Sequence, residues 1–169
     1  MHISRELLTL ASVRQQEVKP VNINMQRIVI EAITRLNDMI LHENAKVIML
    51  NQLHKVLGYE GWLEEVWVNY ISNAIKYGGT APVIQLGSEI LDDQRIKFWI
   101  KDNGRGLSEE DWKLLYHKFT RLDTLRAEGH GLGLSIVKRI IEKLNGEVGV
   151  ESANIPGEGC TFYFILPTK

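Results

Sequence analysis

Helical segments alternate along this chain with strands that pair through short turns. Apolar residues recur at the helical period in the segments 25–40, 62–77 and 132–144, which predicts three amphipathic helices. Outside these three, a helix is expected at residues 4–18, before Pro20, and a short one around residues 108–117. Strands are expected at residues 21–23, 45–50, 83–91, 95–101, 147–151 and 161–166. A sheet with one apolar face needs helices to cover that face. The pattern therefore predicts an α+β fold, a two-layer α/β sandwich with one mixed sheet covered by helices on one face.

The sequence also predicts where the helices begin and end and which of their residues face the core. Asn24 is the expected N-cap of a first helix of roughly 16 residues. Gly78 and Gly79 end the second helix, because glycine readily adopts positive φ. The residues expected to face the core are Val29, Ala32, Ile33, Leu36 and Ile40 in the first helix, Val66, Trp67, Tyr70, Ile71, Ala74 and Ile75 in the second, and Leu134, Val137, Ile140, Ile141 and Leu144 in the third.

Composition narrows the class of protein. The 169 residues suffice for one domain with a sizeable core, and 20 basic against 21 acidic residues argue against a general affinity for nucleic acid. Cys160 is the only cysteine, which excludes an internal disulfide framework and a multi-cysteine metal site. No apolar run approaches the length of a membrane span. We expect a cytoplasmic domain without direct membrane contact, whose parent protein could still be membrane-anchored.

Two amides and an ammonium gather on one side of the second helix. At about 100° per residue, Asn69, Asn73 and Lys76 fall together beside the edge of the apolar stripe. An amide carbonyl is a hard oxygen ligand suited to Mg²⁺, and Lys76 is placed to meet phosphate oxygens. The alternative is an ordinary solvated face.

A second group of residues follows the strand at 95–101. In Asp102-Asn-Gly104-Arg-Gly106, a buried carboxylate would accept the exocyclic amino group of adenine and refuse guanine, which presents a carbonyl there. The two glycines would let the backbone approach the base. The alternative is a common turn.

A glycine-rich segment, Gly129-His130-Gly131-Leu132-Gly133-Leu134, opens the third helix. Unpaired N–H groups at a helix start bind phosphate. Because a polar loop precedes the segment, and not a strand, a Rossmann fold is disfavoured. In that loop Phe119 would pack down a lid or pin the loop to the core, and Arg121, Arg126 or His130 would reach phosphate.

The last strand contributes Thr161, whose hydroxyl is expected to join Asp102 near the base, unless it is a strand threonine without a role. Cys160 is most simply a small buried residue.

In order and spacing, these segments resemble the ATP-binding catalytic domain of sensor histidine kinases, in the superfamily of gyrase B, mismatch-repair and heat-shock chaperone ATPases. The resemblance covers about residues 20–167. It is carried by the N box at 69–77, the first glycine box at 102–106, the F box at Phe119, the second glycine box at 129–134 and the final glycine segment at 157–162.

The resemblance implies a Bergerat-type sandwich that binds Mg²⁺ and ATP under a lid running from about Leu107 to Glu128. Asn73 would be the magnesium ligand, with Asn69 assisting, and Asn69, Asn73 and Lys76 would form the catalytic set. Asp102 would bind adenine. The implied nucleotide contacts are Asn69, Asn73, Lys76, Tyr77, Asp102, Gly104, Gly106, Leu107, Phe119, Arg121, Gly129, His130, Gly131, Leu132, Gly133, Leu134 and Thr161.

One position separates the branches of the superfamily. The hydrolases carry Glu where this chain has Asn69, and an amide is no general base at neutral pH. Phosphoryl transfer is therefore expected. No histidine lies in a phosphoacceptor motif of the family's type. Residues 4–18 resemble only the end of the second dimerisation helix, so the resemblance implies that residues 1–19 are the end of that helix and residues 20–169 the catalytic domain. Its partners would be a dimerisation and phosphoacceptor domain of the same protein and a response regulator, and the fragment alone would bind ATP without phosphorylating itself.

Two other functions fit the same motifs. A stand-alone serine kinase of the anti-sigma type would use the same site, although the helix before Pro20 argues against it. A nucleotide-sensing interaction module without transferase activity is the alternative from another class.

Overall fold

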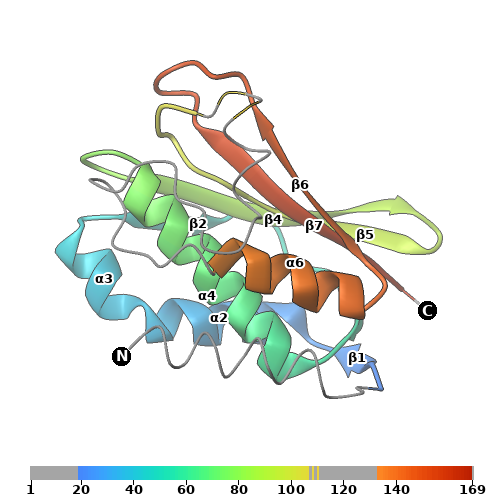
Figure 1. Cartoon of the computed structure of the whole chain (residues 1–169). Helices are drawn as coiled ribbons and strands as arrows, with labels where there is room; N and C mark the ends of the chain where they lie inside the picture. Colours follow the sequence, from blue (N-terminus) through green and yellow to red (C-terminus); the bar gives the residue numbers. More distant parts are fainter. Residues whose placement is uncertain (1–18, 107, 109, 111–132, 169) are drawn as a thin grey trace.

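A five-stranded mixed sheet forms one layer of the molecule (Figure 1). The structure is a computed structural model that describes residues 19–106, 108, 110 and 133–168. The strand order is β2-β4-β5-β7-β6, with β2 parallel to β4 and every other pair antiparallel. The strands are β2 (Lys46–Met49), β4 (Val83–Asp92), β5 (Arg95–Lys101), β6 (Glu147–Ser152) and β7 (Cys160–Pro167). All five were expected from the sequence, as was a mixed sheet.

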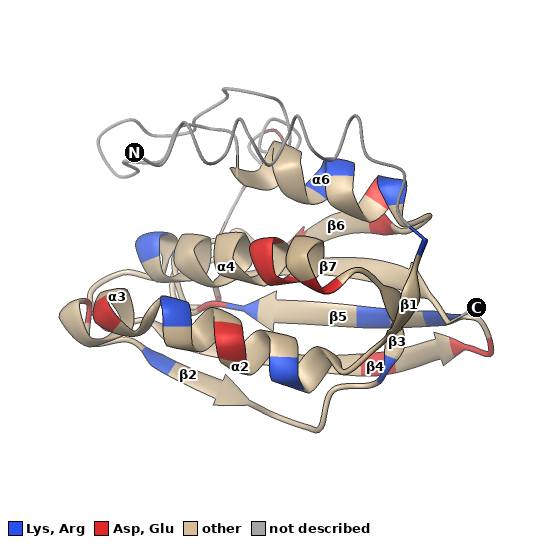
Figure 2. Cartoon of the chain, turned by 90° about the horizontal axis from the view of Figure 1, so that it is seen from below, with Lys and Arg blue, Asp and Glu red and all other residues tan. Residues whose placement is uncertain are grey.

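Helices cover one face of this sheet, so the predicted two-layer sandwich is confirmed (Figure 1). The helices are α2 (Met25–Arg35), α3 (Asn37–His42), α4 (Glu60–Tyr77) and α6 (Gly133–Lys143). Seen from the helical side, α4 runs between α2 and α6, which matches the contacts that α4 makes with both (Figure 2). The helix expected at residues 4–18, and most of the short helix expected around 108–117, lie outside the described residues.

The core lies between the two layers and is rich in aromatic rings. Phe164 of β7 is fully buried and stacks on Phe98 of β5, with ring centroids 5.2 Å apart. Its other side meets Trp67 and Tyr70 of α4, at 5.4 and 6.0 Å. Rings in these offset and edge-on arrangements attract one another beyond their burial. The core faces predicted for α4 and α6 are confirmed, because all their residues are buried.

The first helix departs from its prediction. The chain is helical over α2, leaves helical geometry at Leu36 (φ −98°, ψ 10°) and turns again as α3. Asn37 and Asp38 follow the break, and both residue types have low helix propensity. Val29 and Ala32 are buried as expected, whereas Ile33, Leu36 and Ile40 are partly buried against the core. The prediction of a single helix of roughly 16 residues is therefore wrong, because the segment forms two helices. The prediction of which residues face the core is correct.

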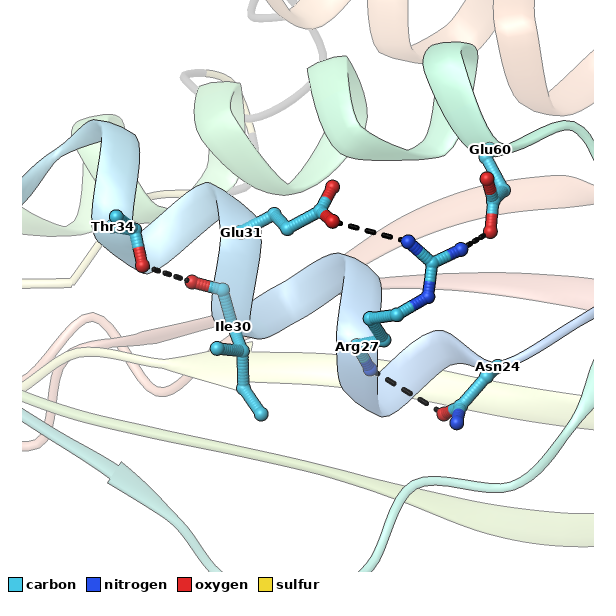
Figure 3. A network of polar contacts seen from close by, with 6 residues as sticks. All are labelled: Asn24, Arg27, Ile30, Glu31, Thr34 and Glu60. Atoms are coloured by element: carbon cyan, nitrogen blue, oxygen red, sulfur yellow. Dashed lines mark hydrogen bonds and ion pairs between the residues drawn. The ribbon is translucent and has the colours of Figure 1, made fainter.

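The N-terminus of α2 is tied to its neighbours by polar contacts (Figure 3). As predicted, Asn24 caps the helix, because its side-chain oxygen accepts the N–H of Arg27 at 3.3 Å. The Arg27 guanidinium bridges Glu31, one turn on, and Glu60 at the start of α4. These contacts link the start of α2 to the start of α4.

A strand that was not expected completes the fold. Strand β3 (Val56–Gly58) pairs antiparallel with β1 (Val21–Ile23), apart from the main sheet. It leads directly into α4. Among the helices that the structure describes, none is long and apolar enough to cross a bilayer.

Candidate functional site

Helix α4 carries the two amides and the ammonium that the sequence singled out. Its apolar stripe is anchored in the core, which leaves Asn69 and Asn73 half-buried at the edge of the stripe and Lys76 exposed. Tyr77, the last residue of the helix, is half-buried. The helical period therefore places these side chains as expected.

The two amides differ in their surroundings. Asn69 Nδ2 donates to the carbonyl oxygen of Glu65 at 2.8 Å, so its Oδ1 points away from that turn. Asn73 makes no side-chain hydrogen bond with any described residue. A half-buried amide without a partner is unfavourable unless water or a ligand satisfies it. Asn73 is thus the amide that is available for an outside ligand.

Asp102 follows β5 and is 5 % exposed. Its Oδ1 accepts the N–H of Gly104 at 2.8 Å, and its own N–H donates to the carbonyl oxygen of Cys160 at 3.0 Å. Burial raises the pKa of the Asp102 carboxyl above its usual value, because the backbone N–H groups of Gly104 and Cys160 and the charge of Lys101 offset the desolvation only in part. A carboxylate has about four lone-pair sites, so these backbone N–H groups leave acceptor capacity for a ligand.

The glycines around Asp102 lie where two backbone segments are in close contact. A Cβ on Gly104 would lie 2.2 Å from the carbonyl oxygen of Tyr77, and one on Gly159 would lie 1.8 Å from that of Asp102. The carbonyl of Gly104 accepts the N–H groups of Gly157 and Gly159, both at 2.9 Å. Gly104 is therefore required by contact with the end of α4, and this contact fixes where Asp102 sits.

Gly106 has φ +80°, a conformation that favours glycine. A Cβ there would meet Ser152 Oγ at 2.7 Å and the carbonyl oxygen of Gly159 at 3.1 Å. This glycine too serves the packing between the 102–106 loop and the turn before β7.

The register of β7 decides which of its residues lies opposite Asp102. Thr161 pairs with Lys101, and successive side chains of a strand point to opposite faces. Cys160 is buried, like Phe162, whereas Thr161 is half-buried. Cys160 is the β7 residue opposite Asp102, because its carbonyl oxygen accepts the N–H of Asp102, and burial, followed by the charge of Asp102, raises the pKa of the Cys160 thiol. Thr161 and Asp102 both line one hollow at this end of the sheet, and the role of Thr161 near the base stays a prediction.

A hollow of about 830 Å³ lies at the same end of the sheet, on the face that the helices leave uncovered. Thr161 contributes to its lining, and neither Asn69 nor Asn73 does. It shares Asp102 with the candidate site but not the two amides of α4. Its walls are Val83, Gln85, Lys101, Asp102, Asn103, Glu151, Ser152, Ala153, Gly157, Glu158, Gly159 and Thr161.

Helix α4 joins the two ends of the candidate site. Near its middle, Asn69 meets Gly133, the first residue of α6, and at its end the carbonyl of Tyr77 meets Gly104. Eight residues of helix separate these contacts, or ~12 Å along the axis.

Of the remaining predicted site residues, Leu134 is buried in the core. The predicted residues outside the described part of the chain are Leu107, Phe119, Arg121, Gly129, His130, Gly131 and Leu132.

Comparison with known proteins identifies the relatives of this chain. It is 33% identical over 164 residues to the phytochrome-like protein Cph1 of Synechocystis, covering 96% of this chain and 21% of that protein. It is 31% identical over 156 residues to the adaptive-response sensory kinase SasA of Crocosphaera subtropica, covering 90% and 40%. The chain thus spans less than half the length of these relatives.

Solved structures give the same fold. The histidine kinase ThkA, solved in complex with the response regulator protein TrrA, superposes with a TM-score of 0.74 at 19% identity, covering 99% of this chain and 48% of that one. The Bergerat-type sandwich expected from the resemblance is thereby confirmed. A sequence profile described as "Histidine kinase-, DNA gyrase B-, and HSP90-like ATPase" matches residues 58–169. The chain belongs to this family of ATPases.

Proposed function

We propose that this chain is the ATP-binding catalytic domain of a two-component sensor histidine kinase. It would transfer the γ-phosphate of ATP to a histidine on a dimerisation domain, from which a response regulator takes the phosphate. The observation that carries the proposal is the buried, incompletely satisfied Asp102 carboxylate at the end of the helix that presents Asn69 and Asn73. Family membership and the names of the relatives support it.

The nucleotide would lie along the C-terminal half of α4. Asp102 would accept the amino group of adenine, and its rigid backing by Gly104 and Gly159 would hold the base in one place. At the other end, the phosphates would lie at the start of α6, because the N-terminus of a helix favours anions. Lys76, which forms no ion pair with a described residue, would supply a positive charge to the phosphates.

Beside α4, the protein would supply one oxygen ligand to Mg²⁺, and water and phosphate oxygens would supply the others. No group of three or more His, Cys, Asp or Glu residues that would bind a metal occurs among the described residues. Asn73 offers one hard oxygen, which suits an ion that keeps its waters and bridges phosphates. When bound, Mg²⁺ would supply charge neutralisation on the transferred phosphate. Asn73 would orient it, and Asn69, lacking a carboxylate, would not activate water.

Several parts of the proposal concern the longer protein. Residues 1–19 would be the end of a dimerisation helix, and residues 20–169 the catalytic domain. The phosphoacceptor histidine would come from another segment, so this chain alone would bind ATP without phosphorylating itself. We place it in the cytoplasm, where ATP and a response regulator are present.

Calorimetric titration with ATP and GTP, each with and without Mg²⁺, tests the proposal. We expect Mg²⁺-dependent binding of ATP and no response to GTP. Adding a dimerisation segment in trans, with γ-labelled ATP, should then move label onto its histidine. Failure of both nucleotides to bind would contradict the proposal, and transfer of label to a serine would replace histidine as the acceptor.

Asn73→Ala tests the metal assignment separately. Removing the amide oxygen should abolish the gain in ATP affinity that Mg²⁺ confers, while the free energy of unfolding stays within about 1 kcal/mol of wild type because the side chain makes no hydrogen bond with a described residue. Calorimetry and urea unfolding measure the two quantities. Unchanged Mg²⁺ dependence would remove Asn73 from the metal site.

A further inference from the structure

Asn69 of α4 and Gly133 of α6 form a close contact between the two helices of the candidate site. A Cβ atom on Gly133 would lie 2.4 Å from Asn69 Oδ1 and 3.4 Å from its Cγ. Real Cβ atoms essentially never approach another heavy atom within 3.0 Å. No side chain fits at position 133 unless Asn69 or the start of α6 moves.

Asn69 would have to break a hydrogen bond to move aside. Its Nδ2 donates to the carbonyl oxygen of Glu65 within the same helix, at 2.8 Å, and the side chain is half-buried. This hydrogen bond also settles which end of the amide faces α6, because the nitrogen is engaged and the oxygen points the other way. The carbonyl oxygen therefore lies at the N-terminus of α6, where the helix dipole favours negative charge.

We propose that Asn69 and Gly133 are positioning residues that hold the N-terminus of α6 at a fixed place on α4. The inference rests on the proposed function, in which that N-terminus binds the phosphates of ATP. Asn73 would then be the amide that faces the metal, and Asn69 would act on the phosphate site through α6. This separates the roles of two amides one helical turn apart.

Gly133→Ala tests the contact, with Gly61→Ala as its matched control. Both glycines lie in the first turn of a helix, and alanine favours helices over glycine. At Gly61 the nearest atom to a new Cβ is 3.9 Å away, so the control should raise the melting temperature and keep ATP affinity within twofold. Gly133→Ala should weaken ATP binding at least tenfold.

Asn69→Ala supplies the second half of the experiment. Without the amide, a methyl group at position 133 has room, so Gly133→Ala should change ATP affinity less than twofold in that background. Asn69→Ala itself should weaken ATP binding by the same factor with Mg²⁺ and with EDTA. Equal losses from Gly133→Ala in both backgrounds, or a loss from Asn69→Ala seen only with Mg²⁺, would overturn the proposal.

The contact can be tested even if the proposed function is wrong. If the wild-type chain bound no nucleotide, urea unfolding of the two single variants and the double variant would still test whether residues 69 and 133 interact. Non-additive unfolding free energies would support it, and additive ones would refute it.

Discussion

The carboxyl of Asp102 lies where its charged form is disfavoured. Desolvation raises its pKa in the folded chain, so the folded state binds a proton more tightly than the unfolded state does. The contribution of this group to stability is fully present below the ordinary carboxyl pKa and is lost as pH rises through the folded value. At neutral pH the ionised side chain therefore costs stability, which the proposed contact with adenine would explain.

Asp102→Asn exposes this conflict. The amide keeps an oxygen for the N–H of Gly104 but carries no charge, so the variant should be more stable than wild type at neutral pH. The difference should shrink as pH falls from neutral through the raised pKa of the wild-type carboxyl, because the carboxyl then takes up its proton and loses its charge. ATP affinity should fall more than tenfold. Urea unfolding at both pH values and calorimetry measure these effects, and a variant less stable than wild type at neutral pH would contradict the argument.

The residues around Asp102 show where sequence reasoning stops at this scale. The Asp and its glycines were found from their spacing, but the contact of Gly104 with the backbone of Tyr77 was not predicted. The sequence analysis placed the hydroxyl of Thr161 near Asp102 and gave Cys160 no part in the site. Which of two adjacent strand residues faces a site depends on register, which only the pairing of β7 with β5 decides. The burial of Cys160 was the one available signal.

At the level of elements, two arginines tie α2 to α4 in different environments. Arg35 Nη1 lies 2.7 Å from Glu64 and 3.0 Å from Glu65, and the three side chains are 19–27% exposed. Arg27, which bridges Glu31 and Glu60, and its partners are about half exposed. Solvent screens exposed pairs strongly, whereas removing one partner of a shielded pair leaves charges without compensation.

Arg35→Met should therefore destabilise the fold by about 1–2 kcal/mol, and Arg27→Met by less than about 1 kcal/mol. Each keeps an unbranched apolar stem, so the comparison isolates the charge. Urea unfolding at low and high salt measures both, and salt should reduce the Arg27 effect more. A larger cost for Arg27→Met would show that exposure does not rank these contacts.

The long helices and strands were predictable, and of the two three-residue strands β1 was predicted at its observed bounds whereas β3 was not. The periodicity of α4 and α6 extends over several turns, so their buried faces followed directly from the sequence. Strand β3 has three residues and pairs only with β1, which leaves no alternation to detect. The break at Leu36 was also hidden, because the apolar period continues through it while the backbone does not.

For the whole molecule, the layers followed from the sequence, but the strand order and the nature of the uncovered face did not. On that face Trp99 and Tyr163 pair across β5 and β7, and each ring lies over a glycine of the next strand, Gly87 and Gly149. Lys97 lies 4.3 Å from the centre of the Tyr163 ring and pairs with Glu151 at 3.3 Å. The sheet thus covers part of its open face with its own side chains, and such pairs become visible only once the strands are ordered.

Phe164 links both layers, which predicts how the molecule unfolds. The ring is fully buried between Phe98 of the sheet and Trp67 of α4, so Phe164→Leu should destabilise the fold by about 1–2 kcal/mol. Tyr163→Leu, one residue earlier on the open face, is the matched control and should cost less.

Because one core cluster spans the helices and the sheet, both variants should unfold in a single transition by circular dichroism and tryptophan fluorescence. Below that transition both should bind ATP within twofold of wild type, since neither side chain contacts Asn73 or Asp102. Separate transitions for helix and sheet signals would mean that the two layers, and with them the two ends of the candidate site, are held together less tightly than their shared core implies.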